Sequence, residues 1–340
     1  MKITPPTNPL ALLFLITLGM PLHLISAEPA PAPVPDSSQD FSQLRNPVWT
    51  TRDNLRDPSV YKAADGYHLY YSRYAADLNW GRASAWSVRE VVTRDFVHFD
   101  KDHAVTPDGY ASPGDVVFWG DRFVLPYQHY PSPPKQLYFS ESRDHASWSA
   151  PQPFLAEALA LPWNTEHRAI DPTFVIDGDT LHCFFVGSAQ VPDPAGGKPI
   201  RANLLGHAIT RDPALKDWTI LTMDHPLIGT SERAPDGVEN IAVFRTGTDW
   251  TMIYSEGLAH QHIALATSPD LMKWTPQGRI ELPMQNWMQA RYGAPFVWPD
   301  GKGWLMVLMG EDANKKTTFG LLSSSDGRKW NLLPERANAP

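Results

Sequence analysis

The sequence predicts an all-β protein, a five-bladed β-propeller with mainly four antiparallel strands in each blade. Three observations support this prediction. One closing phrase recurs five times, and each copy follows a hairpin turn and a third strand. Short strands of five to eight residues, rich in Val, Tyr, Phe and Trp, dominate the chain, and no stretch has the length and periodicity of a helix. Repeats of roughly 50–60 residues are typical of propeller blades, and four to eight blades close a ring.

The closing phrase marks the end of each repeat. It reads "TRDFVHF", "SRDHASW", "TRDPALKDW", "SPDLMKW" and "SSDGRKW", ending at Phe99, Trp148, Trp218, Trp274 and Trp330. We expect these aromatic residues to pack between adjacent blades. The hairpin turns are "ADGYHLYYS", "WGDRFVLPY", "IDGDTLHCFF", "RTGTDWTMIY" and "PDGKGWLMVL". We expect "NLLPE" after Trp330 to complete the outer edge of the fifth blade without a strand from the N-terminal segment.

The N-terminal region differs in composition from the rest. Residues 1–27 combine Lys2, an apolar run and small residues before a cut after Ala27, as in a secretory signal peptide. Pro21 and His23 interrupt the run, which disfavours a membrane anchor. Residues 28–48 read as a Pro-rich tether, and 49–335 as the catalytic propeller. We expect a periplasmic or secreted protein that has no membrane association after cleavage.

Charge and cysteine content exclude several classes of protein. The net charge is −8, which disfavours a nucleic-acid or anionic-membrane partner. Cys183 is the only cysteine, so no internal disulfide forms, and its place in an apolar run predicts an inert buried thiol. No phosphate-binding loop, dinucleotide fingerprint or Cys/His metal motif is visible.

Acidic residues recur where the innermost strand of each blade begins. Reading the repeats in order gives Asp57, Asp115, Asp171, Glu239 and Pro295. In "DP" pairs the proline sits where no ladder hydrogen bond is needed. Taken singly, each acid could cap a strand or pair with a neighbouring arginine. Four carboxyl groups at one repeated position are better explained as a site on the axis, because isolated buried acids are costly.

Two carboxyl groups flanking a bond are the usual device of a glycosidase. One protonates the leaving oxygen, and the other activates water or attacks directly. Nearby aromatic residues fit the platform that a sugar ring needs, although each alone is explained as well by packing. They are Tyr71, Trp80, Trp86, Tyr127, Trp163, Trp287 and Tyr292.

The segments "RDPSV", "IDPTFVIDG" and "GVENIAVF", in this order on the repeats, resemble glycoside hydrolase family 43 and its relatives. The resemblance covers about residues 50–335. It implies that Asp57 is the general base, that Asp171 orients the acid and tunes its pKa, and that Glu239 is the general acid. It also implies inversion and a carbohydrate substrate.

Two departures from the family bear on ligands. The fifth blade has Arg291 and Tyr292 where the family often has a histidine, so we expect these residues to bind substrate and no cofactor or axial calcium to be required. Asp115, His167 and Trp80 are further candidates for substrate contacts. A related family uses a histidine as acid, which keeps His167 open for that role too.

Alternatives remain at both the residue and the function level. Glu166 and Glu232 lie in loops leading into innermost strands and are the next candidates for the acid. A non-catalytic carbohydrate-binding propeller is a rival to the hydrolase, as is a phosphorylase or transglycosidase on the same fold. Basic residues converging on the pocket would favour a phosphorylase. The sequence leaves the sugar, the linkage and the oligomeric state open.

Overall fold

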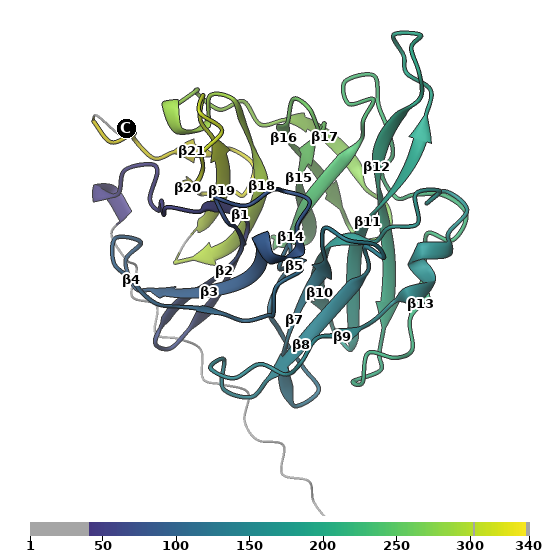
Figure 1. The fold of residues 1–340 in the computed structure, drawn as a ribbon, viewed down its shortest axis with the longest axis horizontal. Helices are drawn as coiled ribbons and strands as arrows, with labels where there is room; N and C mark the ends of the chain where they lie inside the picture. Colours follow the sequence, from purple (N-terminus) through teal and green to yellow (C-terminus); the bar gives the residue numbers. More distant parts are fainter. Residues whose placement is uncertain (1–40, 302, 338–340) are drawn as a thin grey trace, which may run out of the picture. The chain divides into compact units, whose positions relative to one another are not determined.

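The computed structural model describes residues 41–301 and 303–337. The predicted signal peptide and the tether up to residue 40 lie outside the described residues. Five antiparallel sheets surround a common centre, as Figure 1 shows. The predicted all-β fold of five blades is confirmed. The helices of the described part are four short 3-10 turns: η1 (Phe41–Gln43), η2 (Ala83–Ala85), η3 (Ala156–Ala160) and η4 (Asn286–Met288). None of these is long and apolar enough to cross a membrane.

Four blades are plain four-stranded meanders whose strands follow in sequence order from the centre outward. They are β1 (Asn54–Ala63), β2 (Gly66–Tyr74), β3 (Trp86–Thr93) and β4 (Phe99–Ala104) in blade one; β10 (Ile170–Asp177), β11 (Thr180–Val191), β12 (Ile200–Thr210) and β13 (Thr219–Ile220) in blade three; β14 (Val238–Thr246), β15 (Asp249–Glu256), β16 (His262–Ser268) and β17 (Thr275–Arg279) in blade four; and β18 (Arg291–Asp300), β19 (Gly303–Glu311), β20 (Thr317–Ser324) and β21 (Asn331–Leu332) in blade five.

The second blade has a divided innermost strand. β5 (Tyr110–Ala111) and β6 (Val117–Trp119) both pair with β7 (Arg122–His129). β8 (Leu137–Ser142) and β9 (Gln152–Pro153) complete the sheet. The interruption falls at the segment "SPGD". Here Pro113, whose φ angle is fixed, and Gly114 lie outside the two paired segments of the strand.

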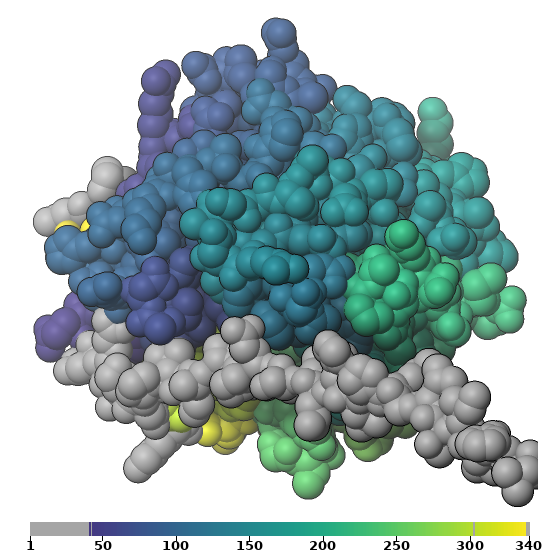
Figure 2. Space-filling view, turned by 90° about the horizontal axis from the view of Figure 1, so that it is seen from below, coloured from purple at the N-terminus to yellow at the C-terminus, as the bar shows by residue number. Residues whose placement is uncertain are grey.

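The hydrophobic core is divided into layers between neighbouring blades. Separate buried clusters join blades one and two, two and three, three and four, four and five, and five and one. The aromatic residues of the closing phrases join these layers: the Trp148 ring lies 5.7 Å from Tyr70 of blade one, and the Trp274 ring 6.1 Å from Phe184 of blade three. The predicted packing role is confirmed. In the space-filling view the surface of the first three blades is continuous (Figure 2).

The polar half of the closing phrase builds the same turn in four blades, and a longer version of it in blade three, where both oxygens of Asp212 accept backbone hydrogen bonds. In blade four the Ser268 hydroxyl accepts a hydrogen bond from the Asp270 N–H, and Asp270 Oδ1 accepts from the N–H groups of Met272 and Lys273 at 2.9 and 3.0 Å. Leu271, between them, has φ of 64°. The sequence repeat is therefore a repeated side-chain-to-backbone turn.

The edge of the fifth blade differs from the expectation. β21 pairs with β20 as predicted, but the N-terminal segment also binds this edge. Trp49 pairs with Phe319 antiparallel, and Asn46 pairs with Glu335. Residues 41–48, assigned to the tether from the sequence, pack here, and Leu44 and Val48 join the cluster between blades five and one. Both ends of the described chain thus close the ring.

Candidate active site

Each blade carries one residue in the left-handed backbone region where its innermost strand begins. In blades one, three, four and five the pairing register slips at this point, so the residue forms a bulge; in blade two the equivalent residue lies in the break between β5 and β6. A bulge re-aims its side chain out of the sheet, here toward the axis. The five residues have φ between 47° and 51°: Asp57, Ser112, Asp171, Asn240 and Ala294.

The equivalence between blades therefore differs from the one predicted. Ser112, Asn240 and Ala294 occupy the repeated position, and the sequence analysis had placed Asp115, Glu239 and Pro295 there. In four of the blades this residue precedes a proline, which disfavours the right-handed helical region at that residue. The repeated "X-Pro" pattern could have identified this position from the sequence. A prediction based on carboxyl groups misses Ser112 and Ala294, because neither residue is an acid.

Asp57, Asp171 and Glu239, the predicted catalytic residues, nevertheless come together. They line one cavity of about 200 Å³. Asp57 comes from β1, Asp171 from β10 and Glu239 from β14, immediately before the bulge at Asn240. The cavity is lined by Arg56, Asp57, Trp80, Trp86, Ala111, Ser112, Gln128, Tyr130, Arg168, Ile170, Asp171, Arg201, Glu239, Asn240, Leu258 and Arg291.

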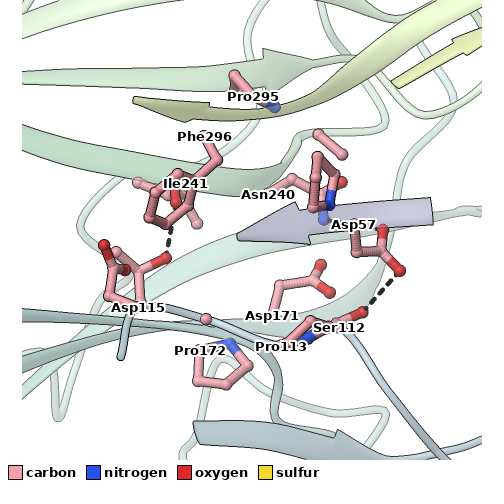
Figure 3. Close-up of a pocket in the computed structure, with 14 residues that line it drawn as sticks. Asp57, Ser112, Pro113, Asp115, Asp171, Pro172, Asn240, Ile241, Pro295 and Phe296 are labelled. Carbon is pink, nitrogen blue, oxygen red and sulfur yellow. Dashed lines mark hydrogen bonds between the residues drawn. The ribbon is translucent and has the colours of Figure 1, made fainter. Parts of the chain in front are cut away.

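Hydrogen bonds fix the orientation of two of the carboxyl groups. Asp57 Oδ2 accepts from the Ser112 hydroxyl at 3.2 Å, as Figure 3 shows, and Oδ1 accepts from Asn240 Nδ2 at 3.4 Å. Both donors are bulge residues of other blades.

The two oxygens of Glu239 meet side-chain amides. Asn203 Nδ2 donates to Oε2 at 3.0 Å, and Gln261 Nε2 donates to Oε1 at 2.5 Å. Asn203 is held in turn by its backbone, which pairs with Gly237. Gly237 has φ of 88°, and a Cβ there would lie 1.8 Å from the Asn203 carbonyl oxygen. Only glycine fits beside the strand that carries this amide.

Asp171 and Glu239 hold their protons to higher pH than ordinary acids. Burial raises the pKa of Asp171 to about 8, and the charges of Glu239 and Asp57 act in the same direction. Burial is also the main cause that raises the pKa of Glu239, followed by the charge of Asp57. Asp171 N–H donates to Gln128 Oε1 at 2.6 Å, which fixes the backbone at the bulge. The cavity therefore holds carboxyl groups of different protonation at one pH.

Asp115 lies away from the cavity. It lines a narrow channel of about 30 Å³ along the axis, among prolines that follow the bulges. Figure 3 shows Asp115 and Asp57 at opposite ends of the group drawn. Burial raises the pKa of Asp115 to about 7. Among the residues described, no cluster of three or more His, Cys, Asp or Glu side chains is placed to hold a metal ion.

The other predicted binding residues divide into two groups. Trp80 and Arg291 line the cavity; Trp80 is 41% exposed, and Arg291 forms an ion pair with Glu311 at 2.8 Å. Tyr292 does not line it, because its side chain is buried in the cluster between blades four and five. His167 is exposed, and its Nδ1 meets the Leu159 carbonyl oxygen at 2.9 Å.

Neither alternative acid belongs to the lining. Glu166 is exposed and accepts a hydrogen bond from Gln190, and Glu232 is exposed in its loop. Of the other aromatic candidates, Trp86 lines the cavity beside Trp80, with ring centroids 4.4 Å apart. Tyr130, which the sequence analysis missed, completes this wall and lies 4.8 Å from Trp86.

Three arginines of the cavity were also missed: Arg56, Arg168 and Arg201. Arg56 and Arg168 are among the arginines that lie near the acids in the sequence. Arg56 immediately precedes the bulged Asp57, and this position could have identified it as a cavity residue. Arg201 lies in a hairpin far along the chain from any motif, and the sequence carried no sign of it.

Comparison with solved structures shows the same fold in glycoside hydrolases. One described as a glycoside hydrolase superposes with a TM-score of 0.66 at 12% identity, covering 85% of this chain and 90% of its own. A thermostable family-43 glycoside hydrolase gives 0.60 at 16% identity, covering 87% and 98%. The catalytic domain of a family-62 α-L-arabinofuranosidase from Coprinopsis cinerea gives 0.58 at 14%, covering 79% and 90%. The predicted likeness in fold to family 43 is confirmed. No protein-family model and no curated protein matches the sequence.

Proposed function

We propose that this protein is a glycoside hydrolase that acts on plant or algal oligo- or polysaccharides, with Asp57 as general base and Glu239 as general acid. The observation that carries the proposal is the meeting of Asp57, Asp171 and Glu239 in one cavity, with raised pKa values at Asp171 and Glu239. The fold shared with glycoside hydrolases supports it.

The proposed reaction uses the two carboxyl groups in opposite states. Asp57, held by the donors Ser112 and Asn240, takes a proton from a water molecule as that water attacks the anomeric carbon. Glu239 gives its proton to the departing glycosidic oxygen. Burial and the charge of Asp57 favour the protonated form of Glu239, as an acid requires.

Asp171 is proposed as the residue that sets the protonation of this pair. With its pKa raised to about 8, it carries a proton at neutral pH, so the cavity is not crowded with three negative charges. In the aromatic wall of Trp80, Trp86 and Tyr130, the exposed Trp80 provides the stacking surface for a sugar ring.

The test is a panel of chromogenic glycosides and polysaccharides, followed by the anomeric configuration of the first product by NMR. Inversion is expected. Hydrolysis that survives both Asp57→Asn and Glu239→Gln would overturn the assignment. Binding of oligosaccharides without any turnover would favour the carbohydrate-binding propeller.

We also propose export to the periplasm or the exterior, on the basis of residues 1–27. N-terminal sequencing of protein recovered from its host tests this, with a mature start near Glu28 expected.

A further inference from the structure

The cavity concentrates positive charge in a protein of net negative charge. Its lining contains Arg56, Arg168, Arg201 and Arg291, while the whole chain carries a net charge of −8. Arg291 is neutralised by Glu311. The other three guanidinium groups form no ion pair within 4.0 Å with any described carboxylate.

Arg168 is the most constrained of these groups. Its side chain is only 8% exposed, and its buried Nε has no hydrogen-bond partner in the described chain. The backbone is fixed by Asn164, whose Nδ2 donates to the Arg168 carbonyl oxygen at 2.7 Å. Burial lowers the pKa of Arg168, and the charge of Arg201 lowers it further. The buried Arg168 and the exposed Arg201 thus line one cavity with like charges that weaken each other, which favours binding of an anion between them.

The charges of Asp171 and Glu239 raise the pKa of Arg168 and partly offset this effect, but no described carboxylate forms an ion pair with the Arg168 guanidinium group. Asp171 is protonated at neutral pH because its pKa is raised to about 8. Asp57 and Glu239 have their oxygens occupied by donors from Ser112, Asn240, Asn203 and Gln261. The unpartnered Nε of Arg168 therefore remains free to donate to a ligand.

We propose that Arg168 and Arg201 bind an oxyanion carried by the substrate, the carboxylate of an acidic sugar residue. The inference rests on the proposed function and names its substrate class. A guanidinium group binds a carboxylate through two parallel hydrogen bonds, a geometry that an ammonium group does not offer. Free inorganic phosphate has the same recognition chemistry and is the other source that the experiment distinguishes.

Arg56 completes the site on the side of the aromatic wall. Its guanidinium carbon lies 5.0 Å from the centroid of the Trp80 ring, so this charge is stacked and directed by the wall. A sugar ring stacked on the exposed Trp80 would lie beside Arg56, in the cavity that Arg168 and Arg201 also line.

The first experiment measures binding by calorimetry with the full-length Asp57→Asn protein, in which turnover is suppressed. The probes are galacturonate and glucuronate, with galactose and glucose as their neutral counterparts. Each uronate is expected to bind about 10- to 100-fold more tightly than its neutral counterpart, with an affinity that falls as salt is raised. Equal affinity for the uronates and the neutral sugars would overturn the proposal.

Variants locate the binding to these side chains. Arg201→Ala and Arg168→Met are each expected to weaken uronate binding by about tenfold or more and to leave neutral sugars unaffected. Arg143→Ala, on the exposed edge of blade two, is the matched control and is expected to bind as the parent does. Circular dichroism checks folding; if Arg168→Met unfolds, the exposed Arg201 decides the outcome, and unchanged uronate binding by Arg201→Ala overturns the proposal.

A third experiment, with phosphate, distinguishes the two possible sources of the oxyanion, an acidic sugar and free inorganic phosphate. Inorganic phosphate is titrated in the same way, and any glycoside that is cleaved is incubated with phosphate. Formation of a sugar 1-phosphate, in which a phosphate oxygen bonds to the anomeric carbon while the departing oxygen takes the proton of Glu239, would overturn the acidic sugar in favour of free phosphate.

The results also separate this inference from the hydrolase proposal. Arginine-dependent uronate binding without cleavage of any glycoside supports the oxyanion site and contradicts the hydrolase. Cleavage of a neutral glycoside, together with uronate binding that Arg201→Ala leaves unchanged, supports the hydrolase and contradicts the oxyanion site.

Discussion

Asp57 and Glu239 are the side chains whose loss is expected to cost most. Asp57→Asn removes the base and Glu239→Gln removes the transferable proton, while each amide keeps the size of the original group. Each change is expected to lower the rate by on the order of 10²–10⁴ with the fold retained. The measurement is kcat/KM on the best glycoside, with a thermal melt for folding. Glu232→Gln, exposed outside the cavity lining, is the matched control and is expected to react as the parent does. Near-normal activity of Glu239→Gln would contradict its role as the general acid.

Replacing Asp171 by asparagine is expected to change how the rate of hydrolysis depends on pH. Activity declines on the alkaline side as the acid loses its proton, and that limb belongs to the coupled pair of Asp171 and Glu239. Both have raised pKa values, so the limb lies above the usual range of carboxyl groups. Asp171→Asn removes the negative charge that Asp171 would gain there. The apparent pKa of the alkaline limb is therefore expected to fall, together with the rate. An unchanged limb in a pH–rate profile would show that Asp171 does not set the protonation of the acid.

At the scale of the element, the closing turns are expected to make stability depend on acid pH. Backbone N–H groups lower the pKa of the turn aspartates Asp144, Asp212, Asp270 and Asp326 below the usual 3.8. A lowered folded-state pKa gives stability that is fully present above about pH 4 and is lost as pH falls through the folded-state value.

One turn suffices for the measurement. Asp270→Ala is expected to lower the free energy of unfolding at pH 7 by at most about 1 kcal/mol, because water screens exposed hydrogen bonds. The difference from the parent protein in urea unfolding should shrink toward pH 3. A difference that stays constant with pH would show that the charge of Asp270 contributes nothing.

The elements also show what the sequence could and could not reveal. Closing phrases and hairpin turns are local, since a turn such as Ser268–Lys273 is built by neighbours in the chain, and these predicted the blades. The positions of the bulges were harder to predict. A shift of one residue in the pairing register decides whether Glu239 or Asn240 occupies the bulge, and that register depends on the partner strand. Arg168 and Arg201 line one cavity only because the folded strands bring distant parts of the chain together, which no local pattern encodes.

At the scale of the whole molecule, Asn46 is expected to contribute strongly to closure of the ring. It is fully buried; its Oδ1 accepts from the Leu321 N–H at 2.8 Å, and its Nδ2 donates to the Leu321 carbonyl oxygen at 3.0 Å. Asn46→Ala leaves both backbone groups without their partner, at a cost of about 2–4 kcal/mol in the free energy of unfolding. Urea denaturation measures this. Asn331→Ala, exposed on the same edge, is the control, and a loss of equal size there would refute the special role of Asn46.

The pairing of Asn46 with Glu335 on the edge of blade five also means that the ring has no obligatory starting point. A short linker between these neighbours would join the ends, and new ends can be cut at the exposed Gly247–Thr248 turn of the hairpin that links β14 and β15. Such a circular permutant keeps all five sheets and the order of the blades around the axis. It is expected to fold and to retain any glycosidase activity of the parent, because the cavity is assembled by geometry and is independent of which blade is synthesised first.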